Sequence, residues 1–244
     1  MQWLRDSWIR EGRGIPRDAP KKQGIALFAE ILLREWWEMV KLNLLFVLAS
    51  LPLVTIPASL AAMASVSVAF VEDRNIYLAR DFLAAFRRHF AAATVLGVVL
   101  GGSIALGAHA VVSYASLANE NLMFAAPLAV TLGATAFLCI FACHVLVLMV
   151  MRDLSYLQLA RLAARASLAR PMPAIGALGL VAVLWLVHIL FYPLSVFMPA
   201  TVNFSLGMFA ITFAVHRAAN DVLAMPRVLP AGLEADPHDP APTT

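Results

Sequence analysis

Residues 42–71 form an uncharged, apolar run that Pro52 and Pro57 interrupt in the middle. A run of about 30 residues exceeds the roughly 20 that one helix needs to cross a bilayer, whereas each half holds only about 15. Pro57 suits the first turn of a second helix, where its missing N–H costs no hydrogen bond, and Pro52 weakens the end of the first. The pattern therefore predicts a tight helical hairpin, with Thr55 capping freed backbone amides. A re-entrant hairpin, which returns to the same side of the membrane, is the alternative.

The composition excludes an ordinary soluble domain. Of 244 residues, 61% are hydrophobic and 14% are charged, and the mean hydropathy is +0.81. Soluble domains carry closer to about 25% charged residues. We therefore predict an all-α fold, a polytopic membrane bundle of helices. The basic N-terminal residues contain no apolar segment of the signal-peptide type, so we expect no removable signal peptide.

Periodicity and turn residues divide the chain into three regions. Residues 1–24 predict a flexible basic arm, residues 25–225 a membrane domain, and residues 226–244, with five prolines, a disordered tail. The membrane domain is predicted to hold six spans. They lie at about residues 37–53, 57–71, 90–112, 123–151, 173–192 and 201–216.

Polar segments between the spans predict further helices. Residues 25–41 are expected to form an interfacial helix that enters the bilayer, with Trp36 and Trp37 at headgroup depth. Residues 75–90 and 152–170 have apolar residues on one face and predict two amphipathic helices along the membrane surface.

The basic residues predict the topology. All 18 Lys and Arg residues lie in the segment through Lys41, in residues 72–90, in residues 152–170 or after the last span. The other connections, residues 52–57, 113–123 and 193–203, contain none. By the positive-inside rule both termini are expected in the cytoplasm, with six crossings, or four if residues 42–71 form a re-entrant hairpin.

Three stretches resemble the YesL family of bacterial integral membrane proteins. They are Leu42-Asn43-Leu44-Leu45, Leu51-Pro52-Leu53-Val54-Thr55-Ile56-Pro57-Ala58 and Asp81-Phe82-Leu83-Ala84-Ala85-Phe86-Arg87-Arg88. The resemblance covers about residues 26–115, and the family glycine before the second proline is Ile56 here. It implies a six-span bacterial inner-membrane protein of no established molecular function, often encoded beside genes for carbohydrate uptake or degradation.

No motif predicts catalysis or a cofactor. Apart from Glu120 in an outer connection, the acidic residues lie at the cytoplasmic ends of the predicted spans and not inside them, and no HExxH, CxxC, GxSxG or Walker pattern occurs. We therefore expect a protein that is not an enzyme, with no catalytic, cofactor-binding or metal site. Cys139 and Cys143, one helical turn apart, are predicted to pack as free thiols. The histidines His109, His144 and His188 are expected to pack through hydrogen bonds, with a site between His109 and His188 as the alternative.

Two features inside the predicted spans indicate close helix contacts. Asn43 is expected to make an interhelical hydrogen bond that fixes the first hairpin, because an amide in a membrane helix needs partners. Gly97 and Gly101 form a small-xxx-small motif, which allows a close helix approach either inside the molecule or in self-association.

Basic surface residues predict the partners. Arg87 and Arg88, and the stripe of Arg161 and Arg165, are expected to contact anionic lipid headgroups or the surface of a partner protein. On a partner, Phe82 and Phe86 would be apolar anchors, and Asp81 would pair with an arginine or cap backbone amides. The net charge of +3 does not indicate nucleic-acid binding, because no stacking aromatics accompany the basic residues.

Two functions remain after these exclusions. The first is a non-catalytic accessory or assembly protein that works with a carbohydrate uptake system such as an ATP-dependent transporter, where the carbohydrate part rests on the resemblance. The alternative is a small transporter or permease component for a sugar-related solute. It would need a solvated polar path lined by Asn43, His144 or the serines and threonines of the spans.

Overall fold

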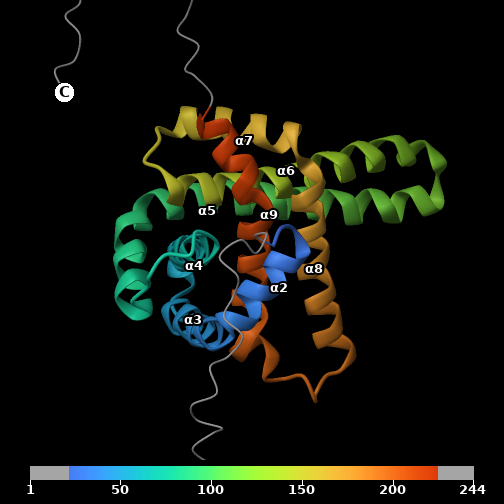
Figure 1. Cartoon of the computed structure of the whole chain (residues 1–244). Helices are drawn as coiled ribbons and strands as arrows, with labels where there is room; N and C mark the ends of the chain where they lie inside the picture. The colour runs from blue at the N-terminus through green and yellow to red at the C-terminus, as the bar shows by residue number, and fades with distance from the viewer. Residues whose placement is uncertain (1–21, 225–244) are drawn as a thin grey trace, which may run out of the picture.

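The computed structural model describes residues 22–224, and every regular element among them is a helix (Figure 1). The predicted all-α class is therefore confirmed. The tail predicted for residues 226–244 lies outside the described residues, as does the predicted N-terminal arm apart from its last three residues.

The N-terminal segment consists of two helices, α2 (Ile25–Arg34) and α3 (Trp36–Ala49), which meet at Glu35. The single interfacial helix predicted for residues 25–41 is therefore wrong. The backbone at Glu35 leaves the helical conformation, with φ −97° and ψ 11°, although its amide still donates to the carbonyl of Ile31 at 2.8 Å. The chain thus changes direction just before Trp36 and Trp37.

The first hairpin has the predicted form. After α3, Pro52 precedes the 3-10 turn η1 (Leu53–Thr55), and α4 (Ile56–Val71) carries Pro57 in its first turn. The Thr55 hydroxyl, however, donates to the carbonyls of Ala49 at 2.5 Å and Pro52 at 2.6 Å. The predicted capping of amides by Thr55 is therefore wrong: its hydroxyl satisfies carbonyls that the end of α3 leaves free.

Helix α5 (Leu78–Glu120) joins what the sequence predicted as three pieces. It runs for 43 residues, and Figure 1 shows it changing direction after its first turns. The predicted loop over residues 113–123 is wrong, because residues 113–120 contain no proline or glycine to end the helix. The helix stops where Asn121 turns extended and its side chain accepts from the amide of Met123. The next elements are η2 (Leu122–Phe124) and α6 (Ala125–Met151).

The second predicted amphipathic helix is confirmed as α7 (Tyr156–Ala169). It begins with a capping box in which Ser155 and Gln158 each bind the other's backbone amide. The remaining elements are α8 (Pro171–Leu190), the π-helix η3 (Pro199–Asn203) and α9 (Phe204–Ala224). Pro171 begins α8, and α9 extends beyond the predicted end at residue 216.

Four helices are long and apolar enough to cross a membrane, which indicates a membrane protein. They are Leu53–Val71, Leu78–Glu120, Leu122–Met151 and Pro171–Leu190. Helix α3 has 14 residues and is about 21 Å long, less than the roughly 30 Å of a hydrocarbon core. Helix α9 carries Arg217 and Asp221. If residues 42–71 formed a re-entrant hairpin, neither of its arms would cross the membrane. The four helices therefore differ from the four crossings of that alternative, because they include Leu53–Val71, the second arm of the first hairpin.

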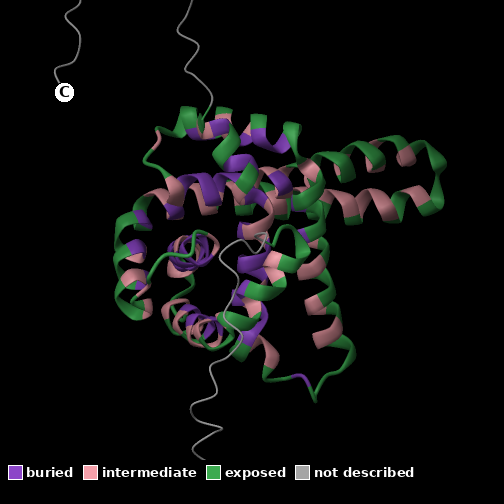
Figure 2. Ribbon diagram, viewed as in Figure 1, coloured by how far each residue is buried: buried purple, intermediate pink, exposed green. Residues whose placement is uncertain are grey.

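Buried residues gather where the helices cross, and the outer parts of α5, α6 and α8 are exposed (Figure 2). One core cluster lies mainly on α6, α7 and α9, with a few residues of α4, α5 and α8, and the other joins α2, α3, α4 and α9 with Phe82 and Ala85 of α5. Helix α8 buries only Ala174 and Ala177. Its exposed side chains include the large, apolar Ile175, Val183, Leu186 and Ile189, as expected for a surface that faces lipid.

Asn43 is fully buried and makes the predicted interhelical contact, but with a different partner. Its side-chain amide donates to the carbonyl of Pro199 at 2.8 Å, and its side-chain oxygen accepts from the amide of Ser205 at 3.0 Å. These bonds join α3 to the start of α9, so the prediction that Asn43 fixes the first hairpin is wrong. The π-helix η3 leaves this carbonyl and amide available for a side chain from α3.

The glycine motif serves internal packing at one of its two positions. A Cβ at Gly97 would lie 2.5 Å from the Cβ of Pro57, so α5 approaches α4 closely there. A Cβ at Gly101 would have no heavy atom within 4 Å. Cys139 and Cys143 are free, and Cys143 is buried, as predicted for packed thiols.

Candidate functional site

Ion pairs gather the charged segments of the chain at one end of the molecule. They link the α4–α5 connection to α2 and α9, the first part of α5 to the α6–α7 connection, and α7 to α9. The ion pairs are Arg34–Asp73 (2.8 Å), Arg88–Asp153 and Arg170–Asp221 (3.1 Å), and the imidazole of His216 contacts Glu72 at 3.2 Å. We call this region the charged end.

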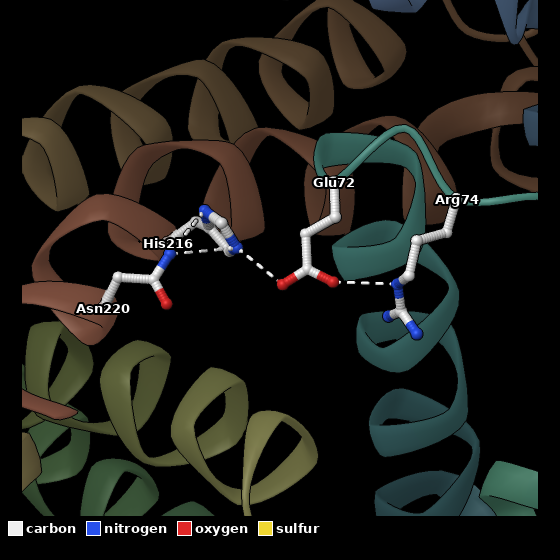
Figure 3. A network of polar contacts seen from close by, with 4 residues as sticks. All are labelled: Glu72, Arg74, His216 and Asn220. Atoms are coloured by element: carbon white, nitrogen blue, oxygen red, sulfur yellow. Dashed lines mark hydrogen bonds and ion pairs between the residues drawn. The ribbon is translucent and has the colours of Figure 1, made fainter. Parts of the chain in front are cut away.

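Glu72, the residue that follows α4, is the centre of a polar network at the charged end (Figure 3). One carboxylate oxygen accepts from Nε of Arg74 at 2.8 Å, and the other lies 3.2 Å from Nε2 of His216. The side-chain amide of Asn220 lies 3.4 Å from Nδ1 of His216. An imidazole protonated on Nε2 satisfies both contacts, because Nε2 then donates to Glu72 and Nδ1 accepts from Asn220.

A cavity of about 390 Å³ lies beside this network, between the end of α4, the first turns of α5 and the end of α6. We call it the charged pocket. Its apolar wall includes Val68, Val150 and Met151. The polar and charged residues that line it are Ser65, Glu72, Arg74, Asp81, Arg88 and His89.

The carboxylates of the charged pocket are already hydrogen-bonded. Asp81 accepts from the backbone amide of Tyr77 at 2.9 Å and from Nε of Arg80 at 3.0 Å, so it makes both of the contacts that the sequence offered as alternatives. The Tyr77 amide, followed by Arg80, lowers the pKa of Asp81. Because its pKa is lowered, Asp81 is ionised at neutral pH. It lies before the uncharged stretch of α5 that begins at Ala91.

His89 differs from the other polar residues of the pocket because it is almost fully buried. It is 6% exposed and makes no hydrogen bond to any residue of the described range 22–224. Burial, and then the nearby Arg88, lower the pKa of His89. The imidazole is therefore neutral at pH 7 and offers one N–H donor and one acceptor.

Most of this pocket lies in a single segment of the chain that matches a known family. Residues 39–108 match the family described as "Protein of unknown function, DUF624". This DUF624 segment contains all six polar residues that line the charged pocket, and only Val150 and Met151 lie outside it. DUF624 includes YesL-like proteins, and no named homologue narrows the match to YesL. No curated protein and no solved structure matches the chain.

Within the DUF624 segment, the two adjacent arginines have different surroundings. Arg88 lines the charged pocket and pairs with Asp153, whereas Arg87 is exposed and makes no ion pair within the described part of the chain. Phe82 is 4% exposed and packs in the core cluster of α2, α3, α4 and α9. Phe86 packs at the edge of the same cluster and meets Phe90 edge to face. Phe82 is therefore not available as the predicted anchor for a partner.

Helix α7 lies outside the DUF624 segment and presents Arg161 and Arg165 outward. Both are exposed, and neither forms an ion pair with another described residue. Leu157 and Leu168, at 61% and 71% exposed, lie on the same side of the helix. The opposite side buries Leu159, Ala163, Ala166 and Ser167 against α6 and α9.

Of the three histidines in the predicted spans, His144 and His188 are hydrogen-bonded locally, whereas the packing predicted for His109 is wrong, because it is exposed. His144 is fully buried, with Nδ1 3.0 Å from the carbonyl of Ile140 and 3.2 Å from the hydroxyl of Ser167. Nδ1 of His188 lies 3.0 Å from the carbonyl of Ser195, and His109 is exposed on α5. Among residues 22–224, no group of three or more His, Cys, Asp or Glu residues could hold a metal ion.

Four lining residues of the charged pocket, Ser65, Glu72, Arg74 and His89, were not among the site residues predicted from the sequence. Of these, His89 had a sequence signal, because it directly follows Arg88. It precedes an uncharged stretch, where an ionisable residue often has a function. Ser65 and Arg74 carried no such signal, because only the packing of α4 against α5 brings them to the same cavity.

Proposed function

We propose that the protein is a non-catalytic accessory or assembly protein of the bacterial inner membrane that works with a carbohydrate uptake system. In this proposal both termini and the charged end lie in the cytoplasm, and the outward side of α7 contacts the partner. The carbohydrate part of the proposal comes from the YesL resemblance. The observation that supports a partner is the exposed stripe of Leu157, Arg161, Arg165 and Leu168.

The stripe combines two kinds of contact that favour a protein partner. Arg161 and Arg165 present planar guanidinium groups that can each hold a carboxylate through two hydrogen bonds. An exposed ion pair contributes only about 0.2–1 kcal/mol, so charge alone would bind weakly. Leu157 and Leu168 add apolar area that a partner would bury.

The surrounding contacts hold α7 in place for such an interaction. The capping box of Ser155 and Gln158 fixes its first turn, and the pair of Arg170 and Asp221 ties the residue after its last turn to α9 at 3.1 Å. A rigid helix loses less conformational entropy on binding than a mobile one. The outward side of α7 therefore supports the proposal as a preformed surface.

The test is co-purification of partners in mild detergent with the double variant Arg161→Lys/Arg165→Lys. Lysine keeps the charge and loses the two-pronged geometry, so we expect the variant to lose an ATP-dependent transporter that the wild type retains. The matched control is Arg87→Lys/Arg217→Lys, which makes the same change at two other exposed arginines. If both double variants retain the wild-type partners, the side chains contact lipid headgroups, and the proposed partner surface is wrong.

The alternative function, a small transporter, has less support from the contacts of its expected path. Asn43 and His144 are fully buried and hydrogen-bonded within the helices. A cavity of about 320 Å³ does lie between α4, α5 and α6, but its lining, which includes Leu60, Leu96 and Met149, contains no polar side chain. A hydrated sugar would lose its hydrogen bonds to water there.

A further inference from the structure

We propose that the charged pocket binds a phosphate group, carried either by an anionic phospholipid headgroup or by a water-soluble phosphate ester. This proposal is independent of the proposed function, because it concerns α4, α5 and α6 and not the outward side of α7. It rests on three observations, which are the unused donors of two arginines, the buried histidine without a partner, and the occupied carboxylates.

The two arginines that line the pocket keep most of their donors free. Arg74 uses Nε for Glu72, and Arg88 uses one Nη for Asp153, which does not line the pocket. A guanidinium carries five N–H donors, so each group has several left. Paired N–H donors of this geometry match the oxygens of a phosphate.

The hydrogen bonds of the two pocket carboxylates indicate which charge a ligand would carry. Glu72 is engaged by Arg74 and His216, and Asp81 by Arg80 and the amide of Tyr77. A cation would have to compete for carboxylate oxygens that already accept hydrogen bonds. An anion meets free N–H groups on Arg74 and Arg88 without breaking these pairs. The pocket therefore favours a negatively charged ligand.

His89 supplies a further polar group that the fold leaves without a partner. Its ring lines the pocket although only 6% of the residue is exposed, and residues 22–224 provide no hydrogen bond to it. The ring nitrogens are not among the fully buried polar atoms that lack a partner, so they keep accessible surface, and a phosphate oxygen would accept from the imidazole N–H. The hydroxyl of Ser65 is a fourth donor on the pocket wall.

The size and position of the pocket fit a phosphate carried by a small molecule or a lipid. Its volume of about 390 Å³ lies within the range of about 300–1,000 Å³ that is usual for ligand pockets. The charged residues lie at the charged end, and the apolar wall of Val68, Val150 and Met151 adjoins helices that are apolar enough to cross a membrane. A phospholipid can thus place its headgroup among the arginines while its chains remain beside apolar side chains.

The experiment uses the purified full chain in a neutral detergent with two probes. Glycerol 1-phosphate, titrated while the melting temperature is followed, tests a soluble ester. Phosphatidylglycerol, compared with phosphatidylcholine by native mass spectrometry, tests a lipid headgroup. We expect the wild type to bind at least one probe, and the probe that binds identifies the source of the phosphate. If neither probe binds, the proposal is overturned.

Variants test whether binding occurs in the charged pocket. Arg88→Gln and Arg74→Gln should each weaken binding of the active probe by about tenfold or more, because each removes donors to a charged group. Asp153→Asn breaks the same ion pair as Arg88→Gln but leaves the pocket donors intact, so it should bind at least as well as the wild type. This variant separates loss of the ligand from loss of the ion pair.

Arg87→Gln is the matched control, because it removes an adjacent, exposed arginine that does not line the pocket. It should leave binding unchanged. If Arg87→Gln weakens binding as much as Arg88→Gln does, binding reflects general surface charge and the discrete site is wrong. The same conclusion follows if Arg88→Gln and Arg74→Gln, confirmed as folded by size-exclusion chromatography, bind like the wild type.

Discussion

Asn43 and Asn203 are both almost fully buried, at 0% and 2% exposed, but they differ in their hydrogen bonds. Asn43 bonds to the carbonyl of Pro199 and the amide of Ser205. Neither polar atom of the Asn203 side chain has a partner among residues 22–224. Substitutions at these two residues therefore distinguish the cost of losing hydrogen bonds from the effect of removing a buried amide that makes none.

We predict that Asn43→Leu destabilises the protein and that Asn203→Leu does not. Leucine has a similar volume, but at position 43 it leaves the Pro199 carbonyl and the Ser205 amide buried without partners, at a cost of about 1–3 kcal/mol. At position 203 it removes polar atoms that make no bond to the described residues. The measurement is thermal unfolding in detergent. Equal losses of stability in the two variants would contradict this assignment.

Helices α4 and α5 show how one element fixes the position of the next. They pack most closely where Gly97 faces Pro57, at the start of α4. Gly101 lies one turn further along α5, toward the outer part of the helix, and faces open space. The small-xxx-small motif thus has one member that is needed for packing and one that is not.

Alanine substitutions at these two glycines should have opposite effects. Gly97→Ala places a methyl group 2.5 Å from Pro57 and forces the helices apart, which should cost about 1–3 kcal/mol. Gly101→Ala meets no neighbour and should be neutral or stabilising by up to about 1 kcal/mol, because alanine favours the helix. The melting temperatures of the two variants in detergent, compared with that of the wild type, test this difference. A Gly97→Ala protein as stable as the wild type would show that α4 and α5 are further apart.

Ser155 is expected to control the order of α7. Ser155→Ala removes the side-chain acceptor of the capping box and should destabilise the helix by about 1 kcal/mol. Hydrogen exchange of residues 156–160 should then become faster. Ser103→Ala is a control, because the Ser103 hydroxyl bonds only to the carbonyl of Val99 within α5. Unchanged exchange in Ser155→Ala would mean that packing against α6 and α9, rather than the cap, orders the first turn.

At the scale of the whole molecule, the charged end assembles segments that are far apart in the sequence. Ion pairs connect residues of α2, α5, α7 and α9 and of the connections between helices. These are the segments in which the sequence concentrates lysine and arginine. Their assembly at one end agrees with a common side of the membrane, and labelling from outside the cell tests which side this is.

Single cysteines in a background without Cys139 and Cys143 should report the topology. Leu53→Cys and Leu194→Cys, at positions 79% and 87% exposed, are expected to react with an impermeant thiol reagent added outside the cell. Asn75→Cys, exposed at the charged end, should react only after the membrane is opened. Labelling of Asn75→Cys in intact cells would contradict the orientation. Labelling of Leu53→Cys from the inside alone would establish the re-entrant hairpin.

The sequence predicted those features that depend on neighbouring residues. Pro52 and Pro57 predicted the first hairpin, and the spacing of apolar residues predicted α7. It could not identify the partner of Asn43, because that contact joins residues 156 positions apart and needs the irregular η3. The charged pocket was missed for the same reason, since α4, α5 and α6 each supply part of its wall. The predicted loop over residues 113–123 failed because polarity alone does not end a helix.

The hairpin of α5 and α6 offers a practical advantage for imaging this chain of 26.4 kDa. Figure 1 shows its tip projecting away from the other helices. Helix α5 has 43 residues and follows a path of about 64 Å, including the change of direction after its first turns. Both helices continue without a break to the short connection at Asn121. A rigid fusion domain inserted there in continuous helical phase would serve as a fiducial for aligning particle images, and it would leave the distant charged end uncovered.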